Sequence, residues 1–211
     1  MKRNFVTVLF LTLEGLLYAA FLILDLQGRR GDTLALKYAG ILLCLCFALL
    51  RGGRLIAAAL ALTAAADWFL LIRGDHLFLG VGIFLCVQSL YALHLRRAGA
   101  GSVWPLRVGL ALLFVLAAFL LELANPLNLL ALVYFSQLVS NAVLAWTCPA
   151  MKRFALGLTL FIGCDVCVGL FNTPFLSGGL FSLVSMGMWL FYLPSQVLIA
   201  LSVLPQKEVS P

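Results

Sequence analysis

Charged residues are scarce in this sequence. Only 10% of its 211 residues are Asp, Glu, Lys or Arg, whereas 64% are hydrophobic and the mean hydropathy is +1.12. In a soluble globular domain about a quarter of the residues are charged. The composition therefore excludes that class and predicts a polytopic membrane protein, in which residues 1–211 form a single domain.

Metal-binding residues are also too few for a metal site. The two histidines, His76 and His94, fall at opposite ends of one apolar run, and most of the six cysteines lie inside such runs. Cys164 and Cys167 share a helical face, yet no second cysteine pair or nearby histidine completes a zinc site. We expect no metal and no other cofactor, and we interpret the thiols as packing residues.

Long linkers are missing as well, and eight apolar runs fill the chain instead. They cover residues 5–26, 33–50, 55–72, 76–95, 103–121, 126–146, 154–171 and 180–204. Each could cross roughly 30 Å of hydrocarbon at about 1.5 Å per helical residue. The first run is too long for the core of a signal peptide. Because lipid offers no partner to an open strand edge, we predict an all-α fold with eight transmembrane helices.

Lysine and arginine are unevenly distributed between the two sides that eight spans define. The side of the termini has ten (Lys2, Arg3, Arg51, Arg54, Arg96, Arg97, Arg107, Lys152, Arg153 and Lys207), and the other has four (Arg29, Arg30, Lys37 and Arg73). Positive residues are enriched in cytoplasmic loops, which predicts that both termini are cytoplasmic. The net charge of +6 then indicates attraction to anionic lipid rather than nucleic-acid binding. We expect an integral membrane protein, located in the plasma membrane if the source is bacterial.

Two aspartates interrupt apolar runs. Asp67 lies in the stretch 61–72, with no Lys or Arg closer than Arg73, and Asp165 lies in the stretch 161–167. Both fall roughly 4–5 Å to the outer side of their span midpoints, at the helical rise per residue, on spans that run outward. Ionisable residues inside the bilayer are costly and usually functional. A structural pairing with Lys37 or a tyrosine is the alternative.

Further polar residues lie at similar depths and could join one cluster. Glu14, Tyr134, Gln137 and Tyr192 are near the middle of their spans, and Lys37 is roughly 7 Å outward. Helical spacing places Gly80, Phe84, Gln88 and Tyr91 on one face, and Tyr192 and Gln196 on another. A single Tyr or Gln is otherwise explained by a hydrogen bond between helices.

A short internal repeat accompanies these residues. Asp67 is followed by Tyr91 one span later, and Asp165 is followed in the same way by Tyr192. Both acids lie on outward-running spans. This pattern predicts two parallel four-helix halves, as some transporters have.

Taken in order along the chain, these residues resemble a known family. The matching positions are Lys37, Ala66-Asp67, Gly80, Phe84, Gln88, Tyr91, Tyr134, Cys164-Asp165, and Tyr192, Gln196, Leu198 and Ile199, the last two after one extra residue. The pattern over about residues 30–200 is similar to that of the YhhN family, whose characterised members are lysoplasmalogenases with eight spans. Gln88 departs from the usual histidine of that family, and Tyr38 from its proline. Glutamine cannot exchange a proton near neutral pH as histidine can.

The resemblance implies a hydrolase that cleaves the vinyl ether of a lysoplasmalogen, giving a fatty aldehyde and a glycerophospho-alcohol. One carboxyl would protonate the enol ether carbon, and an ionised partner would stabilise the resulting cation and activate water, as in glycosidases. We hypothesise that Asp67 and Asp165 are this pair, without assigning which is the acid. Lys37 would meet the phosphate of the lysophospholipid. The remaining candidates for substrate binding are Gln88, Tyr91, Tyr134, Tyr192 and Gln196, with Glu14 as a possible addition.

Two other functions stay open on the sequence. A lipid or solute carrier would use the same acids as proton-coupled or cation sites in two parallel halves. A family member that binds lysolipid without cleaving it would be consistent with Gln88 in place of histidine.

Overall fold

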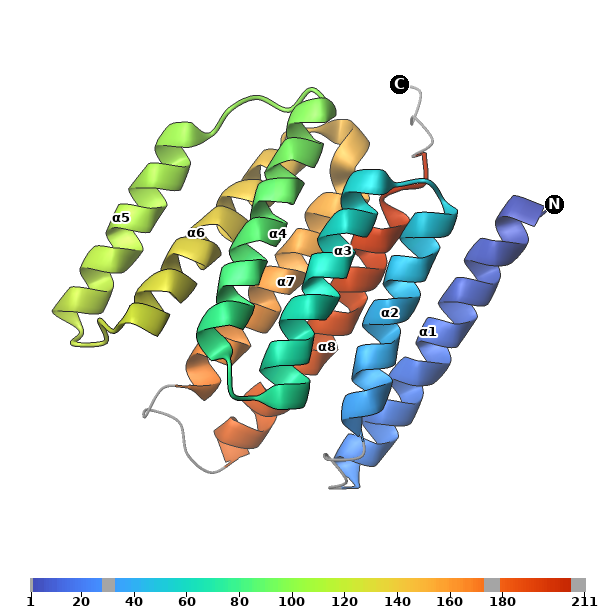
Figure 1. Ribbon diagram of the computed structural model, residues 1–211, viewed down its shortest axis with the longest axis horizontal. Coiled ribbons are helices and arrows are strands. Elements are labelled where there is room, and N and C mark those ends of the chain that lie inside the picture. The colour runs from blue at the N-terminus through green and yellow to red at the C-terminus, as the bar shows by residue number, and fades with distance from the viewer. Residues whose placement is uncertain (1, 28–32, 173–178, 206–211) are drawn as a thin grey trace.

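The computed structural model describes residues 2–27, 33–172 and 179–205, which fold into helices that run side by side (Figure 1). The α-helices are α1 (Lys2–Leu26), α2 (Leu34–Leu50), α3 (Arg54–Asp67), α4 (Leu77–Arg97), α5 (Trp104–Leu120), α6 (Pro126–Trp146), α7 (Lys152–Phe171) and α8 (Gly179–Leu201). Short helices η2 (Trp68–Arg73) and η3 (Pro149–Met151) join the series. The described ranges contain no strand, which confirms the all-α prediction, and the eight predicted runs correspond to α1–α8.

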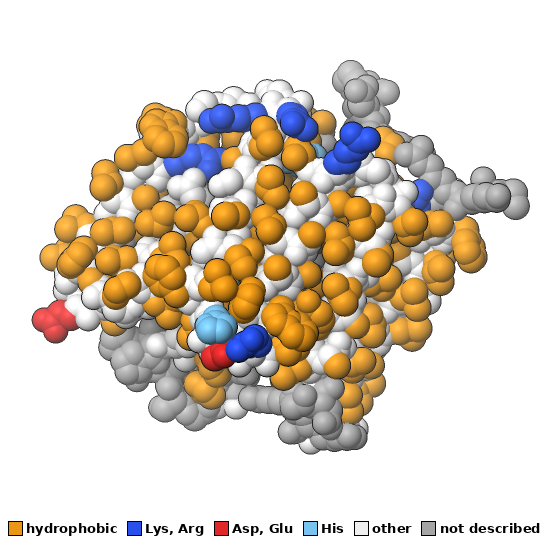
Figure 2. Space-filling view, viewed as in Figure 1, with side chains coloured by type: hydrophobic (Ala, Val, Ile, Leu, Met, Phe, Trp, Pro, Cys, Tyr) orange, Lys and Arg blue, Asp and Glu red, His pale blue; other side chains and the backbone are white. Residues whose placement is uncertain are grey.

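Six of the described helical segments are long and apolar enough to cross a membrane. They are Asn4–Leu26, Arg54–Arg73, Leu77–Arg97, Pro126–Trp146, Pro149–Phe171 and Gly179–Leu201. The other two, α2 and α5, are shorter apolar helices. Figure 2 shows hydrophobic side chains spread over the flank of the molecule, while most of the visible Lys and Arg side chains lie along one end. This distribution is typical of a membrane protein. Eight spans and cytoplasmic termini remain predictions.

Helix packing follows a closed order. Helices α2, α3, α4, α6, α7 and α8 each pack on the next, and α8 returns to α2. Helix α1 packs outside this ring on α2 and α8, and α5 packs outside it on α6 (Figure 1). The segments α2–α4 and α6–α8 therefore occupy corresponding places, an arrangement compatible with the two predicted halves.

The basic residues of several connections lie at one end of the bundle because successive helices alternate in direction (Figure 1). Arg51 and Arg54 flank the α2–α3 connection, Arg96 and Arg97 end α4, and Lys152 begins α7. Of the charges used to predict orientation, Arg29, Arg30 and Lys207 lie outside the described residues.

Local sequence signals account for two features of this packing. Helix α6 begins at Pro126 after Asn125, whose side chain accepts a hydrogen bond from the backbone N–H of Asn128 at 2.9 Å, as expected for an N-cap before proline. Helices α7 and α8 approach closely at Gly157, where a Cβ atom would lie 3.0 Å from the Ser195 carbonyl oxygen. Small residues permit such backbone contact between membrane helices.

Candidate functional site

Asp67 occupies a junction in the helical backbone. It is the last residue of α3, and the chain continues directly into the π-helix η2. The wider turn is visible in the hydrogen bond from the N–H of Gly74 to the Phe69 carbonyl, five residues earlier, at 3.0 Å. The apolar run 55–72 had predicted one regular helix. Single π-turns within α-helices are frequent at functional sites.

Asp67 is paired with a tyrosine from the other half of the chain. The Tyr192 hydroxyl on α8 donates a hydrogen bond to Oδ2 of Asp67 at 2.6 Å, and both side chains are buried. Of the two structural alternatives considered for this acid, Lys37 and a tyrosine, the structure shows the tyrosine. The partner is Tyr192 rather than Tyr91, which follows Asp67 in the sequence repeat.

Asp165 forms a second pair of the same kind. The hydroxyl of Tyr134 on α6 donates to Oδ2 of Asp165 on α7 at 2.5 Å. Tyr134 is buried, whereas Asp165 is half-buried. Asp165 is therefore the less buried of the two residues, a difference that the apolar flanking sequence did not indicate.

Two phenylalanines connect the pairs. Phe84 on α4 lies 5.7 Å from both the Tyr134 ring and the Phe161 ring, and Phe161 lies 5.5 Å from the Tyr192 ring, measured between centroids. Asp165 is also close enough to Asp67 for their charges to interact. The predicted acids and two predicted tyrosines thus share one buried region, walled by aromatic rings. We call these four residues the aspartate–tyrosine cluster.

Lys37 lies beside this cluster but is already paired. Its Nζ is 2.8 Å from Oδ2 of Asp25, and both side chains are largely buried. The same Nζ lies 4.4 Å from the centroid of Trp189, whose ring packs edge-on against Tyr192. Asp25 thus balances the charge of Lys37. Asp25 was not among the residues that the sequence singled out.

Gln88 belongs to a neighbouring polar network. Nδ2 of Asn141 donates to Oε1 and to the backbone carbonyl of Gln88, each at 2.9 Å. The Arg107 guanidinium donates in turn to Asn141 Oδ1 and to Gln137 Oε1. Gln88 is thus oriented from α6 and α5. Asn141 and Arg107 were missed as site residues. An amide side chain within an apolar run could have indicated Asn141, because such side chains form hydrogen bonds between membrane helices.

The remaining candidates are buried at separate positions. All four residues of the predicted α4 face, Gly80, Phe84, Gln88 and Tyr91, are buried, which confirms that face. Tyr91 packs edge-on against Phe154. The fully buried Gln196 donates to the hydroxyl of neighbouring Ser195 at 3.2 Å.

Glu14 lies in a different environment from the aspartate–tyrosine cluster. It is buried, and Oε1 accepts a hydrogen bond from the Cys44 thiol at 3.3 Å. Gly40 lies close by, since a Cβ there would meet Glu14 Oε2 at 3.3 Å and Leu193 at 2.6 Å. These contacts place the Glu14 side chain where α1 packs on α2.

Within the described ranges, no group of three or more His, Cys, Asp and Glu side chains could hold a metal ion.

The arrangement can bind and move protons without further groups. Two carboxyls, each hydrogen-bonded to a phenol, lie near one another in an apolar surround, with a buried lysine beside them. Such a pair can hold one proton or two, and can serve as acid and base toward a bound molecule.

Among known proteins, the family model described as YhhN family matches residues 32–203, the segment that contains all four residues of the cluster. No curated protein and no solved structure matches the chain.

Proposed function

Because the chain belongs to the YhhN family, we propose that it is a membrane-embedded hydrolase that cleaves the vinyl ether of lysoplasmalogens. The observation that carries the proposal is the pairing of Asp67 with Tyr192 and of Asp165 with Tyr134 in one buried region. The products are a fatty aldehyde and a glycerophospho-alcohol.

The proposed reaction needs only an acid, a base and water. One aspartic acid donates its proton to the enol ether carbon, and the electrons of the double bond form the new C–H bond. The resulting oxocarbenium-like cation is stabilised by the other, ionised aspartate. That aspartate takes a proton from water as the water oxygen bonds to the cationic carbon. As the hemiacetal breaks its bond to the glycerol oxygen, that oxygen takes the proton now held by the second aspartate, and the hemiacetal hydroxyl returns its proton to the first. The aldehyde is released, and both aspartates are back in their starting protonation states. Glycosidases divide two carboxyls in a similar way.

The tyrosine hydroxyls suit this division of labour. Each holds its carboxylate by a short hydrogen bond, which restricts the rotation of the carboxyl group and directs its second oxygen. The aromatic wall of Phe84 and Phe161 excludes water around the cation and strengthens its attraction to the carboxylate.

Recognition of the headgroup is assigned to Lys37. It lies beyond Trp189, on the α2 side of the cluster. The ion pair with Asp25 has to loosen for Lys37 to meet a phosphate, so Asp25 limits how strongly this lysine can bind an anion. Gln88 and Gln196 are further polar groups for the glycerol oxygens and water.

The test is aldehyde release from an alkenyl lysophospholipid by the purified protein in detergent. Asp67→Asn and Asp165→Asn should each abolish turnover while the protein still elutes as a monodisperse peak. Asp75→Asn is the matched control, because Asp75 is exposed in the α3–α4 connection and its hydrogen bonds with Arg73 lower the pKa of Asp75. This control removes an ionised carboxylate from an exposed position outside the cluster and should keep normal activity.

Near-normal activity in both cluster variants would discard the mechanism. Binding of lysolipid without aldehyde would favour the non-cleaving family member, and Gln88→His would then be the next variant to assay. Uptake driven by a proton gradient, without product formation, would favour a carrier.

A further inference from the structure

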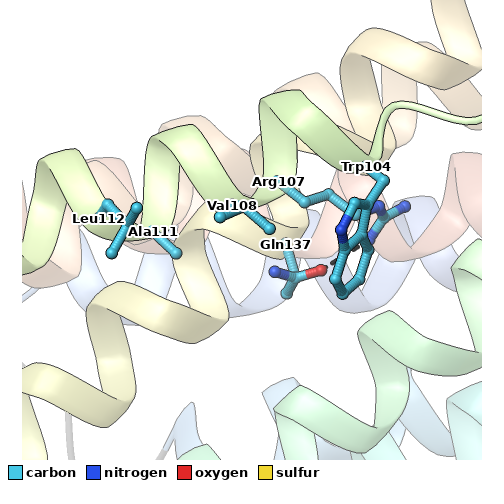
Figure 3. Close-up of a pocket in the computed structure, with 6 residues that line it drawn as sticks. All are labelled: Trp104, Arg107, Val108, Ala111, Leu112 and Gln137. Atoms are coloured by element: carbon cyan, nitrogen blue, oxygen red, sulfur yellow. Dashed lines mark hydrogen bonds between the residues drawn. The ribbon is translucent and has the colours of Figure 1, made fainter.

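A groove lies between α5 and α6, next to the polar network of Arg107, Asn141 and Gln88. It has a volume of about 170 Å³ and is lined by Trp104, Arg107, Val108, Ala111, Leu112 and Gln137 (Figure 3). Five of these residues recur at three or four positions along α5 and so share one helix face. Trp104 and Arg107 lie together near Gln137 at the start of α5, and the apolar side chains continue along the helix (Figure 3). The groove therefore has a polar end and an apolar end.

The polar end has a positive charge that forms no ion pair with an acid of the described residues. Arg107 donates to Gln137 Oε1 at 2.7 Å and to Asn141, and both acceptors are neutral amides. In the described part of the chain no carboxylate forms an ion pair with Arg107. Arg96 is near enough for the two positive charges to repel one another. A guanidinium has five N–H donors, so Arg107 keeps donors for a further acceptor. This end of the groove is suited to an anion.

The apolar end faces the surface that a bilayer would cover. Among the described elements α5 packs on α6 alone, and its Leu112 side chain is 66% exposed. Trp104, at the first position of α5, is 64% exposed. Tryptophan is enriched at the level of lipid headgroups, and leucine lies among acyl chains. The polarity of the groove thus runs in the same direction as the polarity of a phospholipid.

We propose that this groove binds one anionic membrane phospholipid, with its headgroup phosphate on Arg107 and one acyl chain along Val108, Ala111 and Leu112. Arginine binds phosphate oxygens through two parallel N–H donors. The start of α5 adds the partial positive charge of a helix N-terminus. This lipid is a resident ligand rather than the substrate, and the inference does not depend on the proposed hydrolysis.

The experiment is native mass spectrometry of the purified full chain with equal amounts of dioleoyl phosphatidylglycerol and dioleoyl phosphatidylcholine. One phosphatidylglycerol should be retained preferentially. Arg107→Gln should weaken its retention about tenfold, the effect of losing a charge-assisted hydrogen bond. Ala111→Phe should weaken retention as well, because it fills the groove without changing the charge. Arg97→Gln removes the same charge from an exposed position at the same end of the bundle and should retain the lipid normally.

Several results would overturn the site. Equal losses in Arg97→Gln and Arg107→Gln would indicate general attraction to a basic surface. Equal retention of the two lipids, or unchanged retention in Ala111→Phe, would exclude a groove that holds an anionic lipid. Displacement of the lipid by glycerol phosphate at the same concentration would show an anion site that needs no acyl chain. If Arg107→Gln fails to elute as a monodisperse peak, Arg107→Lys and Ala111→Phe provide the test.

Discussion

The hydroxyl groups of Tyr134 and Tyr192 differ from most polar groups of the bundle in having a carboxylate as their acceptor. Removing the Tyr192 hydroxyl leaves Asp67 buried with one partner fewer. Tyr192→Phe should therefore lower aldehyde release about tenfold or more, since hydrogen bonds to charged groups contribute about 1.5–3 kcal/mol. Tyr134→Phe should act in the same direction through Asp165. Initial rates at saturating lysoplasmalogen measure the effect.

Tyr18→Phe is the control for these variants, because the Tyr18 hydroxyl donates only to the backbone carbonyl of Leu190, at 3.4 Å. Its rate should stay near that of the unchanged protein. A Tyr192→Phe protein as active as Tyr18→Phe would show that the hydroxyl of Tyr192 does not support the reaction.

For single residues, the depth of a polar side chain in the membrane could be predicted from the sequence, but its hydrogen-bond partner could not. Counting residues along each span placed Asp67, Asp165, Tyr134 and Tyr192 at compatible depths, and the structure brings all four together. Hydrogen bonding also depends on the rotation of each helix about its axis. Charge alone suggested Lys37 as a partner for the aspartates, but Asp25 faces Lys37 instead.

Among the elements, α7 and α8 approach each other closely at Gly157, a residue that has no side chain. A Cβ at Gly157 would lie 2.9 Å from Cγ1 of Ile199 and 3.0 Å from the Ser195 carbonyl oxygen, so part of the contact is with rigid backbone. Gly157→Ala should therefore lower the thermal unfolding temperature of the protein in detergent. A shift of the helix axes to relieve the contact would also disturb Asp165 and Tyr192, which lie on these two helices.

Gly169→Ala is the matched control on the same helix, since a Cβ there meets nothing within 4 Å. Alanine is favoured over glycine inside a helix by roughly 0.5–1 kcal/mol, so this variant should be neutral or slightly more stable. Equal unfolding temperatures for the two variants would contradict close packing at Gly157.

The helices could be predicted because apolar runs bounded by Gly, Pro and charged residues indicate where a membrane segment begins and ends. Helix α6 begins at Pro126, as expected from the Asn125-Pro126 pair. The π-turn η2 could not be predicted in this way, because the hydropathy of a segment is the same whether each backbone N–H bonds the carbonyl four or five residues earlier.

For the whole molecule, the predicted topology places the two ends of α5 on opposite sides of the membrane. A membrane-impermeant maleimide should then label Ala124→Cys in intact cells, and Gly101→Cys only after the membrane is permeabilised. The unchanged protein, with its own six cysteines, gives the background. Equal labelling of both positions would mean that α5 does not cross. The reverse pattern would place the termini outside.

The packing order of the whole bundle could be predicted only in part. Two parallel four-helix halves were expected from the repeat of Asp67 and Asp165, and they remain a prediction. The structure shows α2–α4 and α6–α8 as consecutive parts of one ring. The exclusion of α1 and α5 from the ring could not be predicted, because both are as apolar as the helices inside it. Lipid and protein neighbours leave the same apolar signature in a sequence.

The π-turn after Asp67 also bears on how the chain can change over time. Deleting one residue from Trp68–Arg73 would turn the wide turn into an ordinary α-helical one. Because a π-turn holds one residue more than an α-helical turn, the segment after the deletion would stay close to its present position, and Asp67 and the helix before it would stay in place. The chain between Asp67 and α4 can therefore lose one residue with a change in the wide turn alone. A change of length in this connection need not alter the position of Asp67.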